Sequence, residues 1–240
     1  MCTVTFIPRR KGYCLGMNRD EKRTRVKGLP PRMQNLSGRS VLYPSEPKGG
    51  TWIAVNDKGI SFALINWYSV PARAFGNVVS RGVIIPAICS GESTEMADAR
   101  LAELPLERIN PFRLIGVFPG SHEILEWRWD LKELTSSHKR WRAQQWISSG
   151  FDERAAQKTR SEAFRQALTQ QSAATLNWLR RLHGSHSPQM GPLSICMHRD
   201  DAATVSYTEL FFYNGRSIMR YGCGTACSIS DMVIKPLGCE

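Results

Sequence analysis

The chain opens, over residues 1–22, with MCTVTFIPRRKGYCLGMNRDEK, and this stretch decides the fold. In its first part threonines alternate with Val4 and Phe6, which is the pattern of a β-strand with one apolar face, so we predict a strand over residues 2–7. A basic turn that ends in glycine follows, and residues 13–17 are predicted to be the antiparallel partner. Such a hairpin would bring the polar residues that come next back toward the first residues of the chain.

Cys2 is the first candidate for chemistry. Methionine aminopeptidase removes Met1 when the next side chain is small, and the chain would then begin with a cysteine that bears a free α-amino group. The amine has an ordinary pKa of about 8 and the thiol one of about 8.5, so both titrate close to neutral pH. One residue would then supply both the nucleophile and the base that takes its proton. The alternative is that Cys2 stands there by chance and has no chemical role.

The polar tetrad Asn18-Arg19-Asp20-Glu21 follows the predicted second strand. A short turn between the two strands would place this tetrad within side-chain reach of Cys2. Arg19 would then lower the pKa of the thiol, and Asp20 would hold the α-amino group through a charge-assisted hydrogen bond. The alternative is four polar residues in a surface turn.

Farther along the chain, paired strand patterns and helical patterns follow one another. The predicted strand pairs cover residues 51–55 with 60–67, 112–118 with 123–129, and 204–213 with 217–221, each joined by a turn that contains glycine. Helical spacing appears over residues 94–104 and 152–182, and in the second of these arginines fill the face opposite the apolar one. Antiparallel hairpins with separate helices indicate an α+β fold, in a single domain of residues 1–240, with helices covering sheet.

The start Met1-Cys2 and the tetrad at residues 18–21 together resemble the signature of the NRDE family, also called the transport and Golgi organisation protein 2 family. Further matches span nearly the whole chain in the right order: Gly49-Gly50-Thr51-Trp52, Asn66, Ser80-Arg81-Gly82, and Ser194-Ile195-Cys196-Met197-His198-Arg199 followed by Thr204-Val205-Ser206. The last group resembles the family's closing strands. The resemblance implies an Ntn-hydrolase-like (N-terminal-nucleophile) four-layer αββα sandwich, with two stacked antiparallel sheets between helices.

That family is in turn similar to penicillin V acylases and bile salt hydrolases, which cleave amides with an N-terminal cysteine. The similarity implies that Cys2 is the nucleophile, that Asp20 binds its α-amino group, and that Asn18 matches the asparagine two places before that aspartate. It also implies that Asn66 is a side-chain donor of the oxyanion hole, where one donor is worth orders of magnitude in rate. The residues of the matching motifs that we expect to contact a ligand are Trp52 and Arg81.

Three departures from the acylase pattern bear on activity. Met17 stands where the acylases carry arginine, so Arg19 must supply that charge from two residues away. Ser136 stands at the position of a second asparagine, and Ala203 at that of a late arginine. By this comparison the amidase machinery is incomplete.

The formal net charge of +11 is concentrated near the N-terminus, between residues 9 and 32. Such a field attracts nucleic acid, anionic lipid head groups, or small carboxylated or phosphorylated ligands. The segment has no helix-turn-helix, zinc-finger or RNA-recognition pattern, so nucleic acid is not an expected partner. The simpler alternative is a solvated basic surface.

Seven cysteines, odd in number and irregular in spacing, indicate reduced thiols rather than a disulfide framework. A zinc site built from Cys196, His198, Cys223 and Cys227 would have C-x-H and C-x3-C spacings, which match no common zinc pattern, so we predict no metal site. No apolar run approaches the roughly 20 residues that cross a bilayer, and no signal peptide is visible. The expected location is therefore the cytoplasm, and no feature indicates an oligomeric state.

Two functions fit these observations. The first is a cysteine Ntn hydrolase that cleaves a non-peptide C–N bond in a small acylated amine, with Cys2 attacking and Asn66 holding the oxyanion. The second is a non-catalytic binding or trafficking protein for a small anionic ligand such as haem or acyl-coenzyme A, which the family resemblance suggests. In that case haem would be cargo rather than a cofactor, and we expect no resident cofactor in either case. The basic N-terminal region and the departures at Ser136 and Ala203 favour the second function.

Overall fold

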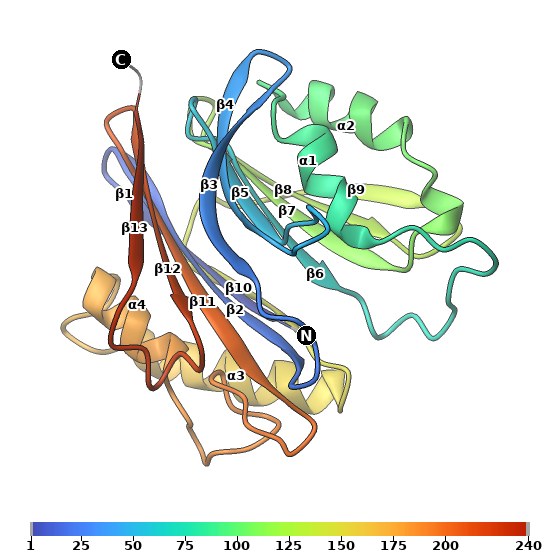
Figure 1. Cartoon of the computed structure of the whole chain (residues 1–240). Helices are drawn as coiled ribbons and strands as arrows, with labels where there is room; N and C mark the ends of the chain where they lie inside the picture. The colour runs from blue at the N-terminus through green and yellow to red at the C-terminus, as the bar shows by residue number, and fades with distance from the viewer. Residues whose placement is uncertain (1, 239–240) are drawn as a thin grey trace.

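The computed structural model describes residues 2–238 and contains two antiparallel β-sheets, which Figure 1 shows facing each other. In the six-stranded sheet the order is β10-β1-β2-β11-β12-β13. Its strands are β1 (Cys2–Arg9), β2 (Gly12–Lys22), β10 (Gln144–Ser148), β11 (Ala202–Tyr213), β12 (Arg216–Cys223) and β13 (Val233–Gly238). The two ends of the chain therefore meet in one sheet, with β2 paired to β11.

The seven-stranded sheet is a meander from β3 to β9, in which each strand pairs with the next one in sequence. Its strands are β3 (Leu29–Leu36), β4 (Arg39–Ser45), β5 (Ile53–Asn56), β6 (Ser61–Asn66), β7 (Phe112–Phe118), β8 (Glu123–Trp129) and β9 (Leu134–Lys139). The chain crosses to this sheet after β2 and returns to the first sheet with β10, so two crossings link the sheets.

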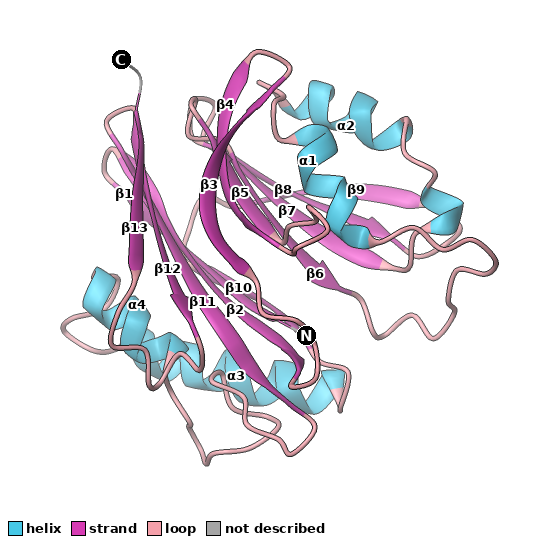
Figure 2. Ribbon diagram, viewed as in Figure 1, coloured by secondary structure: helices cyan, strands magenta, loops and turns pink. Residues whose placement is uncertain are grey.

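Helices cover the outer face of each sheet (Figure 2). The helices over the seven-stranded sheet are η1 (Arg81–Val83), α1 (Ile84–Ile88), α2 (Thr94–Ala102) and η2 (Leu106–Arg108). The helices over the six-stranded sheet are α3 (Glu153–Leu168) and α4 (Leu176–His183). Among the helices of residues 2–238, none combines the length and the apolar character needed to cross a membrane.

Three apolar clusters fill the spaces between these layers. The cluster between the two sheets includes Val4, Phe6 and Met17 from the first sheet and Ile53 and Ile65 from the second. A second cluster joins α1 and α2 to the seven-stranded sheet, and a third joins α3 and α4 to the six-stranded sheet. This arrangement confirms the predicted α+β fold with four αββα layers.

The predicted hairpins are present, and the pair over residues 112–118 and 123–129 has the predicted bounds. The second strand is longer than predicted, because β2 continues to Lys22 and contains the whole polar tetrad. The threonines of β1 do face away from the inter-sheet core, but Thr3 and Thr5 are fully buried, because α3 and α4 cover that face.

Other elements differ from the sequence prediction. The helix predicted over residues 152–182 is two helices, α3 and α4, with a turn at residues 169–175 between them. Residues 194–199, predicted as a strand, form bends, and only His198 pairs, in an isolated bridge with Ala203. The strands β3, β4, β9, β10 and β13 had no sequence prediction.

Candidate active site

The hairpin β1–β2 places Cys2 directly opposite Arg19. Its turn needs glycine at position 12, because a side chain there would overlap the carbonyl group of Phe212 on the neighbouring strand β11. Paired residues of an antiparallel ladder point to the same face of the sheet. Cys2 and Arg19 therefore share the face that looks toward the second sheet, as Val4 and Met17 do two pairs farther along.

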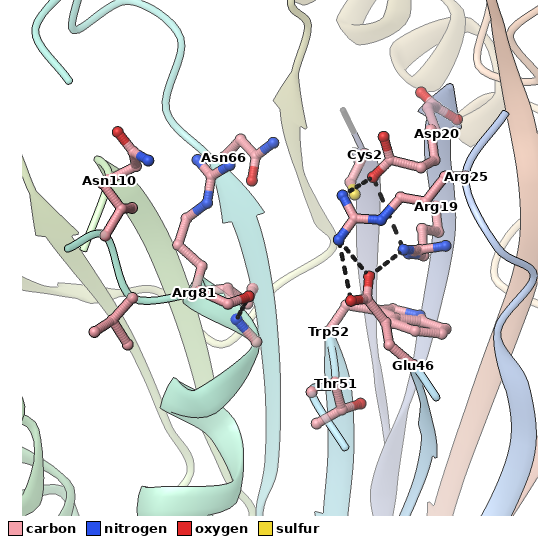
Figure 3. A pocket seen from close by; sticks show the side chains of 17 residues that line it. Cys2, Arg19, Asp20, Arg25, Glu46, Thr51, Trp52, Asn66, Arg81 and Asn110 are labelled. Carbon is pink, nitrogen blue, oxygen red and sulfur yellow. Dashed lines mark hydrogen bonds and ion pairs between the residues drawn. The ribbon is translucent and has the colours of Figure 1, made fainter. Parts of the chain in front are cut away.

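A cleft of about 200 Å3 lies between the two sheets at this end of the hairpin. Figure 3 shows its two walls, with Cys2, Arg19 and Trp52 on one side and Asn66 and Arg81 on the other. The full lining is Cys2, Arg19, Asp20, Glu21, Arg25, Glu46, Gly50, Thr51, Trp52, Leu64, Asn66, Val78, Val79, Ser80, Arg81, Gly82 and Asn110. Six of the seven predicted site residues are thus brought together, and the exception is Asn18.

The Cys2 thiol lies at the bottom of this cleft with 7% of the residue exposed. Burial raises the pKa of the thiol above its ordinary value, and the positive charge of Arg19 opposes that shift only in part. The charge of Arg19 thus lowers the thiol pKa by less than burial raises it, and the activation of Cys2 by Arg19 stays a prediction. The removal of Met1, on which a free α-amino group depends, concerns a residue outside the described part of the chain.

Arg19 is held by an acidic partner and an aromatic ring. Its Nη2 lies 2.6 Å from Oε1 of Glu46, and its guanidinium carbon lies 4.3 Å from the centre of the Trp52 ring. Arg25 joins the network, with Nη2 2.7 Å from Oε1 of Glu46 and Nη1 3.0 Å from Oε2 of Glu21. Glu46 and Arg25 were not predicted as site residues, because each comes from a separate segment and no local pattern marks them.

Asn18 and Asp20 point to the other face of β2, toward the helices. The Asp20 carboxylate accepts hydrogen bonds from Thr204 Oγ1 at 2.7 Å and from Arg160 Nη1 at 3.2 Å, and both members of the Arg160–Asp20 ion pair are fully buried. Asn18 Nδ2 donates to the carbonyl oxygens of His183 and Ile195, at 2.8 and 2.9 Å. Asn18 therefore lies behind the cleft and does not line it. Asp20 lines the cleft and also forms hydrogen bonds in the layer behind it.

The opposite wall carries polar groups of the second sheet. Asn66 Nδ2 donates to the hydroxyl oxygen of Tyr68 at 2.7 Å, and Arg81 Nη1 donates to the carbonyl oxygen of Pro111 at 3.0 Å. Burial lowers the pKa of Arg81, and within residues 2–238 this guanidinium forms no ion pair. The wall therefore offers a neutral amide donor and a cation with no carboxylate at ion-pair distance among residues 2–238, although Glu21 of the same cleft acts on it from farther away.

Two glycines explain why the matching motifs at residues 49–52 and 80–82 come together. The Thr51 amide donates to the carbonyl oxygen of Gly82 at 3.0 Å. A Cβ atom on Gly82 would lie only 3.0 Å from Cα of Gly50, so a side chain there would push the two backbones apart by a few tenths of an ångström. This contact sets Arg81 and Trp52 on facing sides of the same cleft.

The model of the family described as Transport and Golgi organisation 2 matches residues 1–127, more than half of the chain. The chain belongs to the Transport and Golgi organisation 2 family. No curated protein sequence matches this family member.

Solved structures similar to this Transport and Golgi organisation 2 protein include hydrolases with the Ntn fold. Penicillin V acylase from Agrobacterium tumefaciens aligns over 93% of this chain and 83% of its own, with 10% identity and a TM-score of 0.54. Two variants of the conjugated bile acid hydrolase from Clostridium perfringens align over 98% of this chain and 92% of their own, with 9% identity and TM-scores of 0.59 and 0.56. At this level of identity the likeness establishes the fold.

The three departures from the acylase pattern can now be located. Met17 is fully buried in the inter-sheet core, and Ala203 is buried on β11 opposite Glu21. Ser136 is exposed on β9 and does not line the cleft, so its assignment to the site was wrong.

On the side of β1 away from β2, the strand beside Cys2 is β10, and its Ser148 is the residue paired with Cys2. The Ser148 hydroxyl is buried without a hydrogen-bond partner among residues 2–238, which sequence reasoning missed because β10 itself was not recognised.

Proposed function

We propose that this protein is a hydrolase of non-peptide amide bonds in which Cys2 is the nucleophile. The observation that carries the proposal is the position of Cys2 opposite Arg19 in a cleft whose far wall holds the amide of Asn66 and the cation of Arg81. The acylase-like fold is consistent with this chemistry. The geometry supplies a nucleophile, a candidate oxyanion donor and a charged anchor for substrate.

The reaction begins once Met1 has been removed. The Cys2 sulfur attacks the carbonyl carbon of the amide, and its proton passes to the α-amino nitrogen. Asn66 Nδ2, which donates to Tyr68 in the free protein, turns to the oxyanion that forms. The C–N bond then breaks, the leaving amine takes the proton, and an acyl thioester remains on Cys2. Water cleaves the thioester and releases the carboxylic acid.

Arg81 selects the substrate. Because its guanidinium has no acidic partner in residues 2–238 and is half-buried, a carboxylate or phosphate on the substrate would relieve an unbalanced cation. The cleft volume of about 200 Å3 limits what can enter to a small molecule or one end of a longer one. The substrate class is therefore a small acylated amine that carries a negative charge.

The test is a screen of acylated amines with and without an anionic group, using protein whose intact mass shows that Met1 is absent. Cys2→Ala should reduce turnover by several orders of magnitude, as loss of a covalent nucleophile does. Cys223→Ser, which removes an exposed thiol elsewhere, is the matched control and should leave turnover unchanged. Turnover in Cys2→Ala equal to that of the unmutated protein would overturn the proposal.

A second function, binding of an anionic ligand without catalysis, is favoured by two observations. Arg81 lacks an acidic partner among the described residues, and burial raises the pKa of Cys2 so that the thiol is poorly ionised near neutral pH. Titration with haem, followed by the Soret band, and with acyl-coenzyme A, followed by calorimetry, tests this function. Arg81→Met should weaken binding at least about 10-fold, as loss of a charge-assisted contact predicts, while exposed Arg142→Met should not.

A further inference from the structure

Four potential metal ligands converge on the side of the six-stranded sheet away from the cleft. They are His186, Cys196, His198 and Cys227, and their donor atoms all lie within 4.8 Å of one another. None of the four lines the cleft. They come from three places in the chain: the segment that follows α4, the bends before β11, and the turn after β12.

The distances fit a tetrahedral site. His198 Nε2 lies 3.1 Å from His186 Nε2, 3.5 Å from Cys196 Sγ and 3.5 Å from Cys227 Sγ. With zinc–nitrogen and zinc–sulfur bonds of about 2.05 and 2.3 Å, the edges of a zinc tetrahedron are about 3.3 Å for N···N and about 3.6 Å for N···S. The three distances from His198 Nε2 thus match the edges of such a tetrahedron within a few tenths of an ångström, and the other three donor-atom distances lie within 4.8 Å.

We propose that His186, Cys196, His198 and Cys227 bind one zinc ion in a closed, structural Cys2His2 site. Thiolate and imidazole are the ligands that zinc prefers, whereas magnesium and calcium require oxygen ligands. Two thiolates balance the charge of Zn2+. Four protein ligands leave no open position for water or substrate, which is the property of a structural rather than a catalytic zinc site.

The ion would hold a segment that has little regular structure of its own. Residues 184–200 contain no helix and no strand apart from the isolated bridge at His198. Main-chain carbonyl groups of this segment accept hydrogen bonds from side chains that lie behind the cleft. Ile195 accepts from Asn18, and Leu193 and Pro192 accept from Arg160. Zinc would fix this segment at His186, Cys196 and His198.

The fourth ligand ties this segment to a distant turn. Cys227 lies in the connection between β12 and β13, and its Cα is 3.5 Å from where a Cβ on Gly184 would stand. The turn that carries Cys227 therefore packs directly against the end of α4. The zinc ion would cross-link α4, the segment after it and the last hairpin of the six-stranded sheet.

Three of these four residues, Cys196, His198 and Cys227, already formed a candidate group in the sequence, but their spacings match no common zinc pattern, so no metal site was predicted. Folding supplies His186, which no short spacing connects to them. Cys223, the fourth member of that sequence-based group, lies on β12 and is not among the four. Cys223 is therefore a natural control: an exposed thiol four residues from a proposed ligand.

The experiment uses the whole chain, without an affinity tag that binds metal, purified with a phosphine reductant and no chelator. Elemental analysis should find one zinc ion per chain. The metal-free protein, titrated with Co2+, should develop the intense visible bands of tetrahedral cobalt and a thiolate-to-cobalt charge-transfer band in the near ultraviolet. Zinc should displace the cobalt and abolish both.

Variants then assign the ligands. Cys227→Ser should weaken zinc binding by more than the roughly 10–100-fold that loss of an outer partner costs, whereas Cys223→Ser should bind as the unmutated protein does. Because Cys227 is exposed, its loss should leave the fold intact, which circular dichroism checks. Absence of a cobalt spectrum in the reduced protein, or equal zinc affinity in the two variants, would overturn the proposal.

A disulfide between Cys196 and Cys227 is the competing explanation for the proximity of the two sulfurs. It predicts a mass loss of two hydrogens in protein purified without reductant and no cobalt bands after reduction. That result would also overturn the zinc site. The outcome is independent of the amide-hydrolase proposal, because metal content and cobalt spectra are measured without substrate.

Discussion

The two helix–sheet interfaces of this protein are filled in opposite ways. Under α1 and α2, most buried residues are apolar, among them Ile88 and Leu101 against Phe62 of the sheet. The buried amide of Asn56 donates there to the carbonyl oxygens of Cys89 and Gly91, just after α1. Under α3 and α4, buried polar and charged groups lie beside the apolar ones, including Arg160 and His183. One interface holds the fold together mainly by excluding water, and the other also by a network of specific hydrogen bonds.

The difference follows the position of the candidate site. Strands β1 and β2 carry Cys2 and Arg19 on one face, and Asp20 and Asn18 on the face toward α3 and α4. A buried ion pair seldom adds net stability over an apolar contact of the same size, but removing one partner is costly. We therefore infer that the polar interface holds the hairpin in one geometry behind the cleft, while the apolar interface contributes stability alone.

The largest effect is expected from Arg160→Met, which removes the cation beside the buried Asp20 carboxylate. It should lower the free energy of unfolding by about 3–5 kcal/mol, since an uncompensated buried charge remains. It should also change the rate at which iodoacetamide labels Cys2, because the strand that faces Cys2 shifts. Urea unfolding and peptide mapping of the label measure the two effects.

Ile88→Ala in the apolar interface is the matched control. It should cost about 2–5 kcal/mol through the cavity it leaves, yet leave the labelling rate of Cys2 unchanged. Equal changes in labelling rate for the two variants would show that the polar interface has no special relation to the site.

The next effect depends on pH. Burial, with a smaller contribution from the charge of Arg160, lowers the pKa of His183 from 6.5 to about 3. Between those two values the unfolded chain binds a proton that the folded protein does not, so stability falls as the pH falls from about 6.5 toward 3. The slope from this residue reaches about 1.4 kcal/mol per pH unit.

His183→Gln should therefore flatten the stability profile between pH 6 and 4.5, measured by urea unfolding at each pH. This window lies above the range in which most carboxylates titrate, so the difference between variant and unmutated protein isolates the histidine. His138→Gln, at an exposed position on the edge strand β9, should retain the full slope. If both variants keep the unmutated slope, His183 is not held neutral by the polar interface.

The smallest effect on stability is expected from Glu46→Gln, at the cleft itself. The Arg19–Glu46 pair is partly exposed, so its loss should change the free energy of unfolding by less than about 1 kcal/mol. Among residues 2–238, Arg19 would then keep only the longer ion pair with Glu21 at 3.8 Å, so its charge should lower the pKa of Cys2 and speed alkylation near neutral pH by roughly 3- to 10-fold. Glu92→Gln, which breaks the ion pair with Arg39 elsewhere, should not change labelling. If the alkylation rate of Cys2 is the same in Glu46→Gln as in the unmutated protein, Arg19 does not activate the thiol.

Local patterns predicted the parts of this fold whose apolar residues alternate along one segment. The hairpin of Cys2 and Arg19 is an example, because strand alternation and a glycine turn fix its register. Strand β3 was not predicted, since its sequence has two prolines and few apolar residues. Proline is tolerated there because β3 is an edge strand of the sheet.

Arg160 shows the limit of hydrophobic periodicity. Arginines of this helix were predicted to lie on the face opposite the apolar one, and for Arg160 that was wrong, because its side chain is fully buried against Asp20. A polar buried face has the same sequence pattern as a solvated one. Glu46 escaped prediction for a related reason: only the folded chain brings it to Arg19.

The contact between Gly50 and Gly82 has a consequence for how such proteins diverge. At this contact two lining residues of the cleft meet main chain to main chain, and the Ser80 hydroxyl accepts a hydrogen bond from the Gly82 amide beside them. Substitutions at Trp52 or Arg81 therefore exchange what the cleft recognises without moving its walls. Ligand specificity of such a pocket can change through single substitutions of its lining side chains. The two glycines are the positions at which substitutions are tolerated least.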